Sequence, residues 1–260
     1  MSQTPRHIRT DRSLNEAEVE VIRLMGAEFR YGVEVGRDVT LDELRAQGFK
    51  AFYVAIGCQG GRLAGIPGED AEDVTVAVDF LREVNSGKID ALPGRTIVVG
   101  GGNVAIDVAR NACRLGSEHV EMFCLESEAQ MPASEEERRE AVEDGAHISC
   151  GWGPKEVHLD EAGRVCGITF KHCTRVFDDE GRFAPEYDEN DLRRVDADRV
   201  VMSIGQSIVW GDLLAGSKVE LGRGQGALAD PQTYQTAEPD IFVGGDVYTG
   251  PSFAIDAIAA

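Results

Sequence analysis

The sequence has few basic residues and no long apolar run. Lys and Arg number 26 against 46 Asp and Glu, which gives a formal net charge of −20. Such a charge repels polyphosphate backbones and anionic membranes. No stretch approaches the roughly 20 consecutive apolar residues of a membrane span, and the beginning MSQTPRHIRTDRSLNEAE lacks the apolar core of a signal peptide. We expect a cytoplasmic protein with neither nucleic acid nor a membrane as partner.

The six cysteines and five histidines show no spacing that is typical of redox or metal chemistry. No two cysteines form CxxC or CxxxxC, so neither a redox-active disulfide nor a metal site is predicted. Five cysteines stand in apolar or strand-like surroundings, where a free cysteine behaves as a small hydrophobic residue. No histidine has an obvious nucleophile beside it. The sequence therefore predicts no catalytic acid–base residue or triad.

Glycine, in contrast, is abundant, with 30 residues, and helix and strand signals alternate along the chain. This pattern favours an α/β fold with tight strand-to-helix turns. A run of strands over residues 147–179 predicts a β-meander, and residues 177–194 are polar and loop-like. Pro93 and Gly94 indicate a hinge between domains. The predicted helices are 15–27, 41–48, 76–87, 103–115, 134–145 and one from Pro251, and the other strands are 28–35, 49–57, 96–99, 119–125, 197–205 and 239–246.

The segment after strand 96–99 matches the G-x-G-x-x-G/A fingerprint of dinucleotide-binding proteins. Gly100 permits a tight turn, Gly102 lets the backbone approach a pyrophosphate, and Ala105 lets the helix pack closely on the strand. The helix N-terminus supplies N–H groups and partial positive charge. We therefore predict an NAD site, the alternative being a glycine turn without a ligand. The candidate residues are Gly100, Gly101, Gly102, Asn103, Val104 and Ala105.

The fingerprint also requires an acidic residue about twenty positions on, which accepts hydrogen bonds from ribose hydroxyls. Glu126 stands there, followed by Ser127, and no arginine occurs between Arg114 and Arg138. A carboxylate at this position repels a ribose 2′-phosphate. We expect NADH to bind about ten- to a hundredfold tighter than NADPH. The alternative is that Glu126 is a solvated strand end.

Three longer segments carry a family resemblance. The runs IVVGGGNVAIDVARNACRLG, SEAQMPAS and DIFVGGDVYTGPSFAIDAIA resemble the glutamate synthase small-subunit group, which belongs to the pyridine nucleotide-disulfide oxidoreductase superfamily but lacks the redox disulfide. The similarity extends from about Asn15 to Ala260. It implies the fold of a two-dinucleotide-binding flavoprotein. A Rossmann-like NAD(P)-binding domain with the β-meander, residues 94–207, is then inserted into an incomplete FAD-binding domain formed by residues 1–93 and 208–260.

The resemblance also implies positions for an FAD and for the nicotinamide. Ala55, Ile56 and Gly57 match the segment that lies against FAD, and Gly245 and Asp246 match residues that meet its pyrophosphate and ribityl region. A glycine at a strand end allows close approach, and a carboxylate can accept from ribityl hydroxyls. The alternative for Asp246 is a turn or helix-capping role. Met131 to Ser134, and Ser203 to Gln206 with Ile204 and Gly205, match segments beside the nicotinamide.

Two departures from the group change the expectation. Members that use NADPH carry two arginines where this sequence has Leu125 and Glu126, which favours NADH. The first FAD strand with its GxGxxG turn and the cysteine-rich iron–sulfur domain are not found. We therefore expect a fragment of a longer polypeptide whose full-length form holds FAD. In this chain the apolar edges of the FAD sheet would be exposed, so we expect self-association.

The expected function is that of a flavoprotein oxidoreductase. The full-length protein would pass a hydride from NAD(P)H, preferably NADH, to FAD and electrons to a partner subunit or an iron–sulfur domain. Such chemistry needs positioning of cofactors more than an acid–base pair. The alternative is a non-catalytic NAD-binding or assembly module. A disulfide reductase is disfavoured by the missing cysteine motif.

Overall fold

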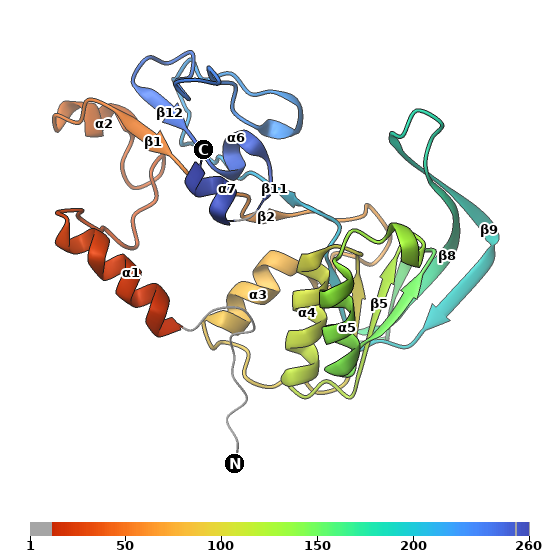
Figure 1. Ribbon diagram of the computed structural model, residues 1–260. Coiled ribbons are helices and arrows are strands. Elements are labelled where there is room, and N and C mark those ends of the chain that lie inside the picture. Colours follow the sequence, from red (N-terminus) through yellow and green to blue (C-terminus); the bar gives the residue numbers. More distant parts are fainter. Residues whose placement is uncertain (1–11, 253, 260) are drawn as a thin grey trace. The chain divides into compact units, whose positions relative to one another are not determined.

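The structure is a computed structural model that describes residues 12–252 and 254–259, and it divides into two compact units (Figure 1). Unit 1 comprises Gly61–Gly205, and unit 2 comprises the described parts of residues 11–60 and 206–260. Two buried apolar clusters lie wholly within unit 1 and a third lies wholly within unit 2. Each unit therefore has a hydrophobic core of its own.

Unit 1 is built on a parallel sheet of five strands in the order β3-β10-β4-β5-β6. The central strand β4 is apolar from Ile97 to Val99, with these side chains at most 2% exposed. A strand covered on both faces reads as such a continuous apolar run. The strands are β3 Val74–Val76, β4 Arg95–Val99, β5 His119–Cys124, β6 His147–Cys150 and β10 Arg199–Met202.

Three helices cover one face of this sheet and lie side by side in Figure 1. They are α3 Ala77–Asn85, α4 Asn103–Arg114 and α5 Glu135–Glu143. Phe80 and Val84 of α3 and Ile106 of α4 are buried in one cluster with Val98 and Met122 of the sheet. Because side chains alternate along a strand, Ile97 and Val99 point to the opposite face.

An antiparallel sheet of order β7-β8-β9 covers that opposite face. Its strands are β7 Trp152–Leu159, β8 Val165–Phe177 and β9 Phe183–Val195. Phe170 of β8 stacks on Phe123 of β5, with ring centroids 4.0 Å apart. The predicted α/β fold with a parallel sheet is confirmed.

Two strand predictions in this region are wrong. Residues 147–150, expected in the meander, form β6 and pair with β5 in the parallel sheet. Residues 177–194, expected as a loop, are mostly strand β9. The side chains of β9 are mainly exposed, so polar residues are compatible with a strand there, while its backbone hydrogen bonds are made with β8.

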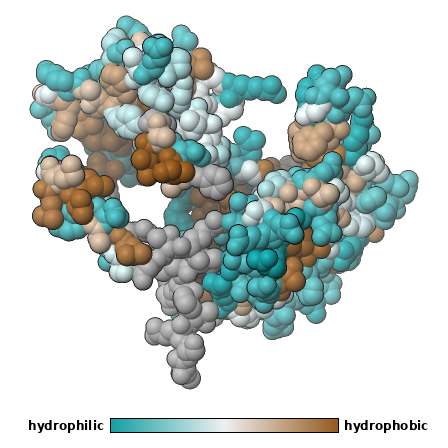
Figure 2. All heavy atoms as spheres, viewed as in Figure 1, coloured by the Kyte–Doolittle hydropathy of each residue, from teal (hydrophilic) through white to brown (hydrophobic). Residues whose placement is uncertain are grey.

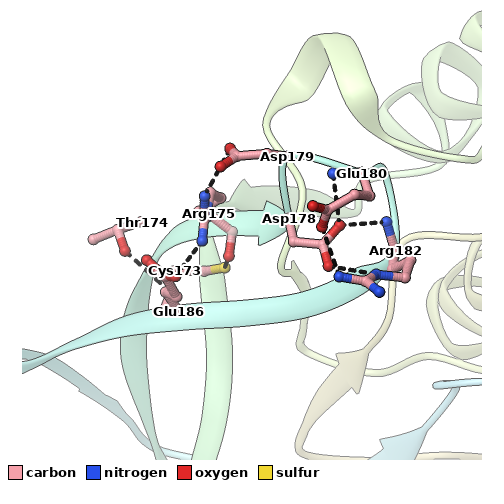
Figure 3. A network of polar contacts seen from close by, with 8 residues as sticks. All are labelled: Cys173, Thr174, Arg175, Asp178, Asp179, Glu180, Arg182 and Glu186. Carbon is pink, nitrogen blue, oxygen red and sulfur yellow. Dashed lines mark hydrogen bonds and ion pairs between the residues drawn. The ribbon is translucent and has the colours of Figure 1, made fainter.

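The turn between β8 and β9 is closed by carboxylates (Figure 3). Asp178 accepts the backbone N–H groups of Glu180 at 3.0 Å and Arg182 at 2.8 Å, and Arg182 Nε donates to its other oxygen at 2.7 Å. These bonds, with the backbone of Arg182 first, hold the pKa of Asp178 below its usual value. Arg175 bridges Asp179 and Glu186.

Unit 2 contains a parallel pair of short strands, β1 Phe52–Val54 and β12 Ile241–Val243. Val54, Ile241 and Val243 form its core together with Leu41 and Leu213. Helix α2 has a complete capping box between Thr40 and Glu43. The helices of unit 2 are α1 Arg12–Leu24, α2 Leu41–Ala46, α6 Asp246–Thr249 and α7 Ala254–Ala259. The described residues also form two 3-10 helices, Glu128–Gln130 in unit 1 and Arg223–Gln225 in unit 2. The remaining strands are β2 Gly60–Gly61 and β11 Gln206–Ser207.

Several expectations for the first part of the chain are also wrong. Residues 28–35 form no strand, because only an isolated bridge between Val35 and Val39 occurs and most side chains there are exposed. Pro93–Gly94 is no hinge: Leu92 is 1% exposed and the Gly94 carbonyl accepts the Glu118 N–H at 2.8 Å. The compact unit starts at Gly61, not at residue 94, because β3 pairs with β10 and α3 packs on α4.

The helix predicted from Pro251 corresponds to α7, which begins at Ala254, and the short helix α6 before it was not predicted. Of all the helices in the described ranges, none combines the length and the apolar character that crossing a membrane requires.

Candidate functional site

Three consecutive glycines form the turn between β4 and α4. Gly100 has φ +141°, and a Cβ there would lie 2.2 Å from the Ser203 carbonyl oxygen. A Cβ on Gly101 would lie 2.9 Å from Cys124 Cβ and 3.1 Å from Glu126 Oε2. Both positions therefore require glycine because of what the protein itself packs against them.

Gly102 differs from its two neighbours. Its φ is −88°, an ordinary value, and a Cβ on it would meet no atom within 4 Å. It is the N-cap of α4, and no side chain caps that end. The first N–H groups of a helix have no acceptor within the helix. The space in front of Gly102 therefore borders donors and partial positive charge, which suits an anion.

The residues after Gly102 begin α4 and fix its position. Ala105 is completely buried, in the cluster between α4 and the sheet. Val104 is half-buried. Asn103 turns its side chain to the loop before α5, where its Oδ1 accepts the Ser134 N–H at 3.2 Å.

The loop Met131–Ser134 is tied to the glycine turn. The Ala133 N–H donates to the Gly101 carbonyl at 3.0 Å. Ser134 then caps α5, because its Oγ accepts the Glu137 N–H at 3.3 Å. The N–H of Ser134 itself is donated to Asn103, so the start of α5 is joined to the start of α4.

Glu126 follows β5 and lies over Gly101, as the 3.1 Å approach of its Oε2 to the Cβ position shows. Its carbonyl accepts the Gly151 N–H at 3.0 Å, which holds this strand end next to β6. Ser127 is exposed, and its hydroxyl donates to Gln130 Oε1 at 2.8 Å. The structure brings Glu126 to the glycine turn as the spacing predicts.

The residues that follow β10 lie at the same edge of the parallel sheet as the glycine turn and Glu126. The Ser203 N–H donates to the Val99 carbonyl at 2.7 Å, and Gly205 has φ +118°. Ile204 between them is 36% exposed. Because β4, β5 and β10 are parallel neighbours, their carboxyl ends place residues 100–105, 126–127 and 203–205 on one edge of the sheet.

Sequence reasoning missed one close pair at this edge. Cys124, interpreted as a hydrophobic residue, lies with its Sγ 3.6 Å from Cys150 Sγ. Burial, together with Cys150 and Glu126, raises the pKa of the Cys124 thiol well above its usual value. The only sequence signal is that each cysteine ends a strand of the same parallel sheet.

In unit 2 the two parallel strands bring the other predicted residues together. Ala55 to Gly57 follow β1, Gly245 and Asp246 follow β12, and the Gly244 N–H donates to the Val54 carbonyl at 3.2 Å. Gly245 has φ +64° and ψ −150°, a conformation that only glycine adopts readily. Asp246 is half-buried, and its Oδ1 accepts the Ser252 N–H at 3.3 Å. This contact lies in the turn between α6 and α7 and supports the turn alternative for Asp246, while no side chain caps the start of α6.

This edge fits part of an FAD site. It offers close backbone approach at Gly57 and Gly245 and one carboxylate for hydroxyl groups. Neither strand of the β1–β12 pair in the described part of unit 2 is followed by a GxGxxG turn and helix, so the pyrophosphate cradle of that type is not found in these residues. Ala55 and Ile56 also line a largely apolar cavity of about 690 Å³ between β1, α2 and Trp210.

Within residues 12–252 and 254–259, no three His, Cys, Asp or Glu side chains are grouped as a metal site requires.

The chain resembles several known proteins over most of its length. It is 34% identical over 96% of its length to AegA of Escherichia coli K12, 31% identical over 92% to the glutamate synthase [NADPH] small chain of E. coli K12, and 31% identical over 96% to the NAD-dependent dihydropyrimidine dehydrogenase subunit PreT of E. coli K12. It covers 40, 54 and 54% of these relatives. The chain thus spans about half the length of the relatives that it matches.

The fold matches that of solved oxidoreductases as well. FprA of Mycobacterium tuberculosis, solved in complex with NADPH, superimposes with a TM-score of 0.74 at 20% identity, over 95% of this chain and 70% of that one. The model of the pyridine nucleotide-disulphide oxidoreductase family matches residues 2–260. The chain therefore belongs to the pyridine nucleotide-disulphide oxidoreductase family.

Proposed function

We propose that unit 1 binds the dinucleotide of NADH at the edge formed by residues 100–105, 126–127 and 203–205. The observation that carries this proposal is Gly102, whose missing side chain is required by no packing contact and leaves open space at the uncapped end of α4. A pyrophosphate in that space accepts the first N–H groups of α4. Gly100, Gly101 and Ala105 shape the turn from the protein side.

Glu126 supports NADH over NADPH. Its carboxylate lies over Gly101, and ribose hydroxyls can donate to it. A 2′-phosphate would meet a like charge there. The names of the relatives include both an NADPH-linked and an NAD-dependent protein, so the local charge is the argument for this choice.

For the whole protein we propose hydride transfer from NADH to FAD and electron delivery to a partner subunit or an iron–sulfur domain. FAD, when bound, accepts the hydride and releases single electrons. Ala55 to Gly57, Gly245 and Asp246 would form one side of its site. Residues Met131–Ser134 and Ser203–Gly205 would hold the nicotinamide by backbone and apolar contacts.

The competing proposal is a non-catalytic NAD-binding or assembly module. It is favoured by the finding that the described part of unit 2 shows no GxGxxG cradle for FAD. Reduction of a dye by NADH, measured with and without added FAD, separates the two. Dye reduction that depends on FAD supports the oxidoreductase, and inactivity under both conditions despite tight NADH binding supports the module.

The nucleotide choice is tested by calorimetric titration with NADH and NADPH. Glu126→Gln should weaken NADH binding by roughly tenfold or more, because hydrogen bonds to a charged acceptor contribute about 1.5–3 kcal/mol. The control variant is Glu128→Gln, whose side chain is exposed in the 3-10 helix after Ser127. Equal or tighter binding of NADPH by the unmodified chain contradicts the preference.

A further inference from the structure

Two cysteines face each other beside the proposed nucleotide site, although they are far apart in the sequence. Cys124 ends β5 and Cys150 ends β6, and the register of these parallel strands sets them opposite each other. Their sulfurs are 3.6 Å apart, and both are free thiols. The two cysteines do not form a CxxC motif, because they are brought together by strand pairing in the sheet.

The geometry allows a covalent bond between them. A disulfide needs Cα atoms about 4.4–6.8 Å apart, and neighbouring strands are separated by about 4.8 Å. The sulfurs must approach each other by roughly 1.5 Å to reach the bonded distance. We propose that Cys124 and Cys150 form a peroxide-sensitive dithiol site that closes to an intramolecular disulfide.

The surroundings assign different roles to the two thiols. Cys124 is 3% exposed and Cys150 is half-buried, so a small oxidant reaches Cys150 first. The burial that raises the pKa of Cys124 keeps that thiol protonated, and its S–H points to the sulfur of Cys150.

Hydrogen peroxide supplies the oxidising equivalents. The Cys150 thiol gives up its proton and its sulfur attacks one peroxide oxygen. The O–O bond breaks, a sulfenic acid forms, and the leaving hydroxide takes up that proton and becomes water. The Cys124 sulfur then attacks the Cys150 sulfur, the S–O bond breaks, and a second water leaves with the thiol proton. In sum the two thiols lose two electrons and two protons, and peroxide becomes two waters.

Formation of the disulfide would change the contacts that Cys124 makes with the glycine turn. The Cys124 Cβ lies 2.9 Å from the position of a Cβ on Gly101, and its Sγ lies 3.7 Å from the Glu126 carbonyl. Drawing Cys124 toward β6 shifts the strand end that carries Glu126. This consequence rests on the proposed function, and we expect the oxidised chain to bind NADH roughly tenfold more weakly.

The disulfide itself is tested on the full chain by peptide mapping without reductant after treatment with hydrogen peroxide. A linked peptide containing Cys124 and Cys150, reversed by dithiothreitol, is expected. It should persist in the control Cys166→Ser, a half-buried cysteine of β8, and be lost in Cys150→Ser. In Cys124→Ser, Cys150 should accumulate as sulfenic or higher acids. Oxidation of the unmodified chain without this linked peptide overturns the proposal.

NADH titration of reduced and oxidised chain is a separate readout. If the reduced chain binds no NADH, the proposed function fails while the disulfide result stands. If the disulfide forms and NADH affinity is unchanged, the proposed coupling to the nucleotide site is overturned.

Discussion

Single residues at the glycine turn meet constraints of two kinds. Gly100 and Gly101 are required by protein atoms, the Ser203 carbonyl and the Cys124 and Glu126 side chains. Gly102 faces open space. The fingerprint spacing predicted these positions and Glu126 because a strand, a tight turn and a helix fix their relative places locally. It could not predict Cys150, whose neighbour is set by strand pairing across the sheet.

Gly102→Ala separates ligand binding from folding. With φ −88° and no atom within 4 Å, an alanine fits the protein without strain, so the melting temperature should stay within about 2 °C. The added methyl group would stand where the pyrophosphate approaches, and NADH affinity should fall at least tenfold. Calorimetric titration and thermal unfolding of the same sample measure both effects.

Gly100→Ala is the matched contrast. Its φ of +141° and the 2.2 Å approach to the Ser203 oxygen make any side chain strained. We expect a loss of about 1–3 kcal/mol in the free energy of unfolding, seen by denaturant titration. If Gly100→Ala were as stable as the unmodified chain, the described turn geometry would be wrong.

Helices and strands were predictable from the sequence where their side chains alternate between core and solvent or are buried throughout. Helices α3, α4 and α5 and strands β4, β5 and β10 were all predicted with small errors at their ends. Strand β9 was missed because its polar side chains are mostly solvated and only its pairing with β8 makes it a strand. Strand 28–35 was predicted from alternation, but the described residues provide no strand ladder for it.

The contact between α4 and α5 depends on an ion-pair network. Asp144, the C-cap of α5, accepts from Arg110 at 2.7 Å and pairs with Arg114 at 3.0 Å, and Arg110 also contacts Glu140. The Arg110 side chain is only 12% exposed. Asp144→Asn removes one of the carboxylates that pair with the largely buried Arg110 guanidinium. It should therefore lower the free energy of unfolding by about 1–3 kcal/mol. Glu143→Gln, on an exposed pair with Arg139, is the control and should change it little.

In unit 2 an ion pair links α2 to the start of β12. Arg45 donates to both oxygens of Asp240, at 2.6 and 2.8 Å, and lowers the pKa of that carboxyl. Because the pKa of Asp240 is lower in the folded than in the unfolded chain, the ion pair stabilises the fold at pH values above the unfolded pKa of about 3.9. This contribution is lost as the pH falls through the folded pKa. Asp240→Asn should cost about 1 kcal/mol or less at pH 7 because the pair is partly solvated.

The cost of Asp240→Asn should shrink when acid protonates Asp240 in the unmodified chain. Urea unfolding at a series of pH values from 7 down to about 3 measures it. A difference between the two proteins that grows toward low pH would contradict this assignment.

At the scale of the whole molecule, the chain forms two units with separate cores. The boundary at Gly61 was not predictable from Pro and Gly punctuation, because the residues that decide it are the β3–β10 partners Thr75 and Val201, which meet only in the folded sheet. Residues 61–205 expressed alone should therefore unfold cooperatively and bind NADH with the affinity of the full chain. A polypeptide of these residues without a thermal transition would contradict the independence of unit 1.

Unit 2 exposes apolar side chains on its helices, and Figure 2 shows hydrophobic surface on α1 and α7. Val21, Ile22 and Leu24 of α1 and Ile255 and Ile258 of α7 are 50% exposed or more. Burial of such surface drives association, so we expect self-association that increases with concentration. Sedimentation velocity should show it weakened in Ile22→Glu, and a monomer at all concentrations would contradict it.

A crystal structure of the chain grown with NADH would show whether the dinucleotide binds between Gly102 and Glu126. We expect the pyrophosphate in front of Gly102 at the start of α4, with the adenosine ribose hydroxyls on the Glu126 carboxylate. NADH bound elsewhere, or a ribose that does not contact Glu126, would contradict it.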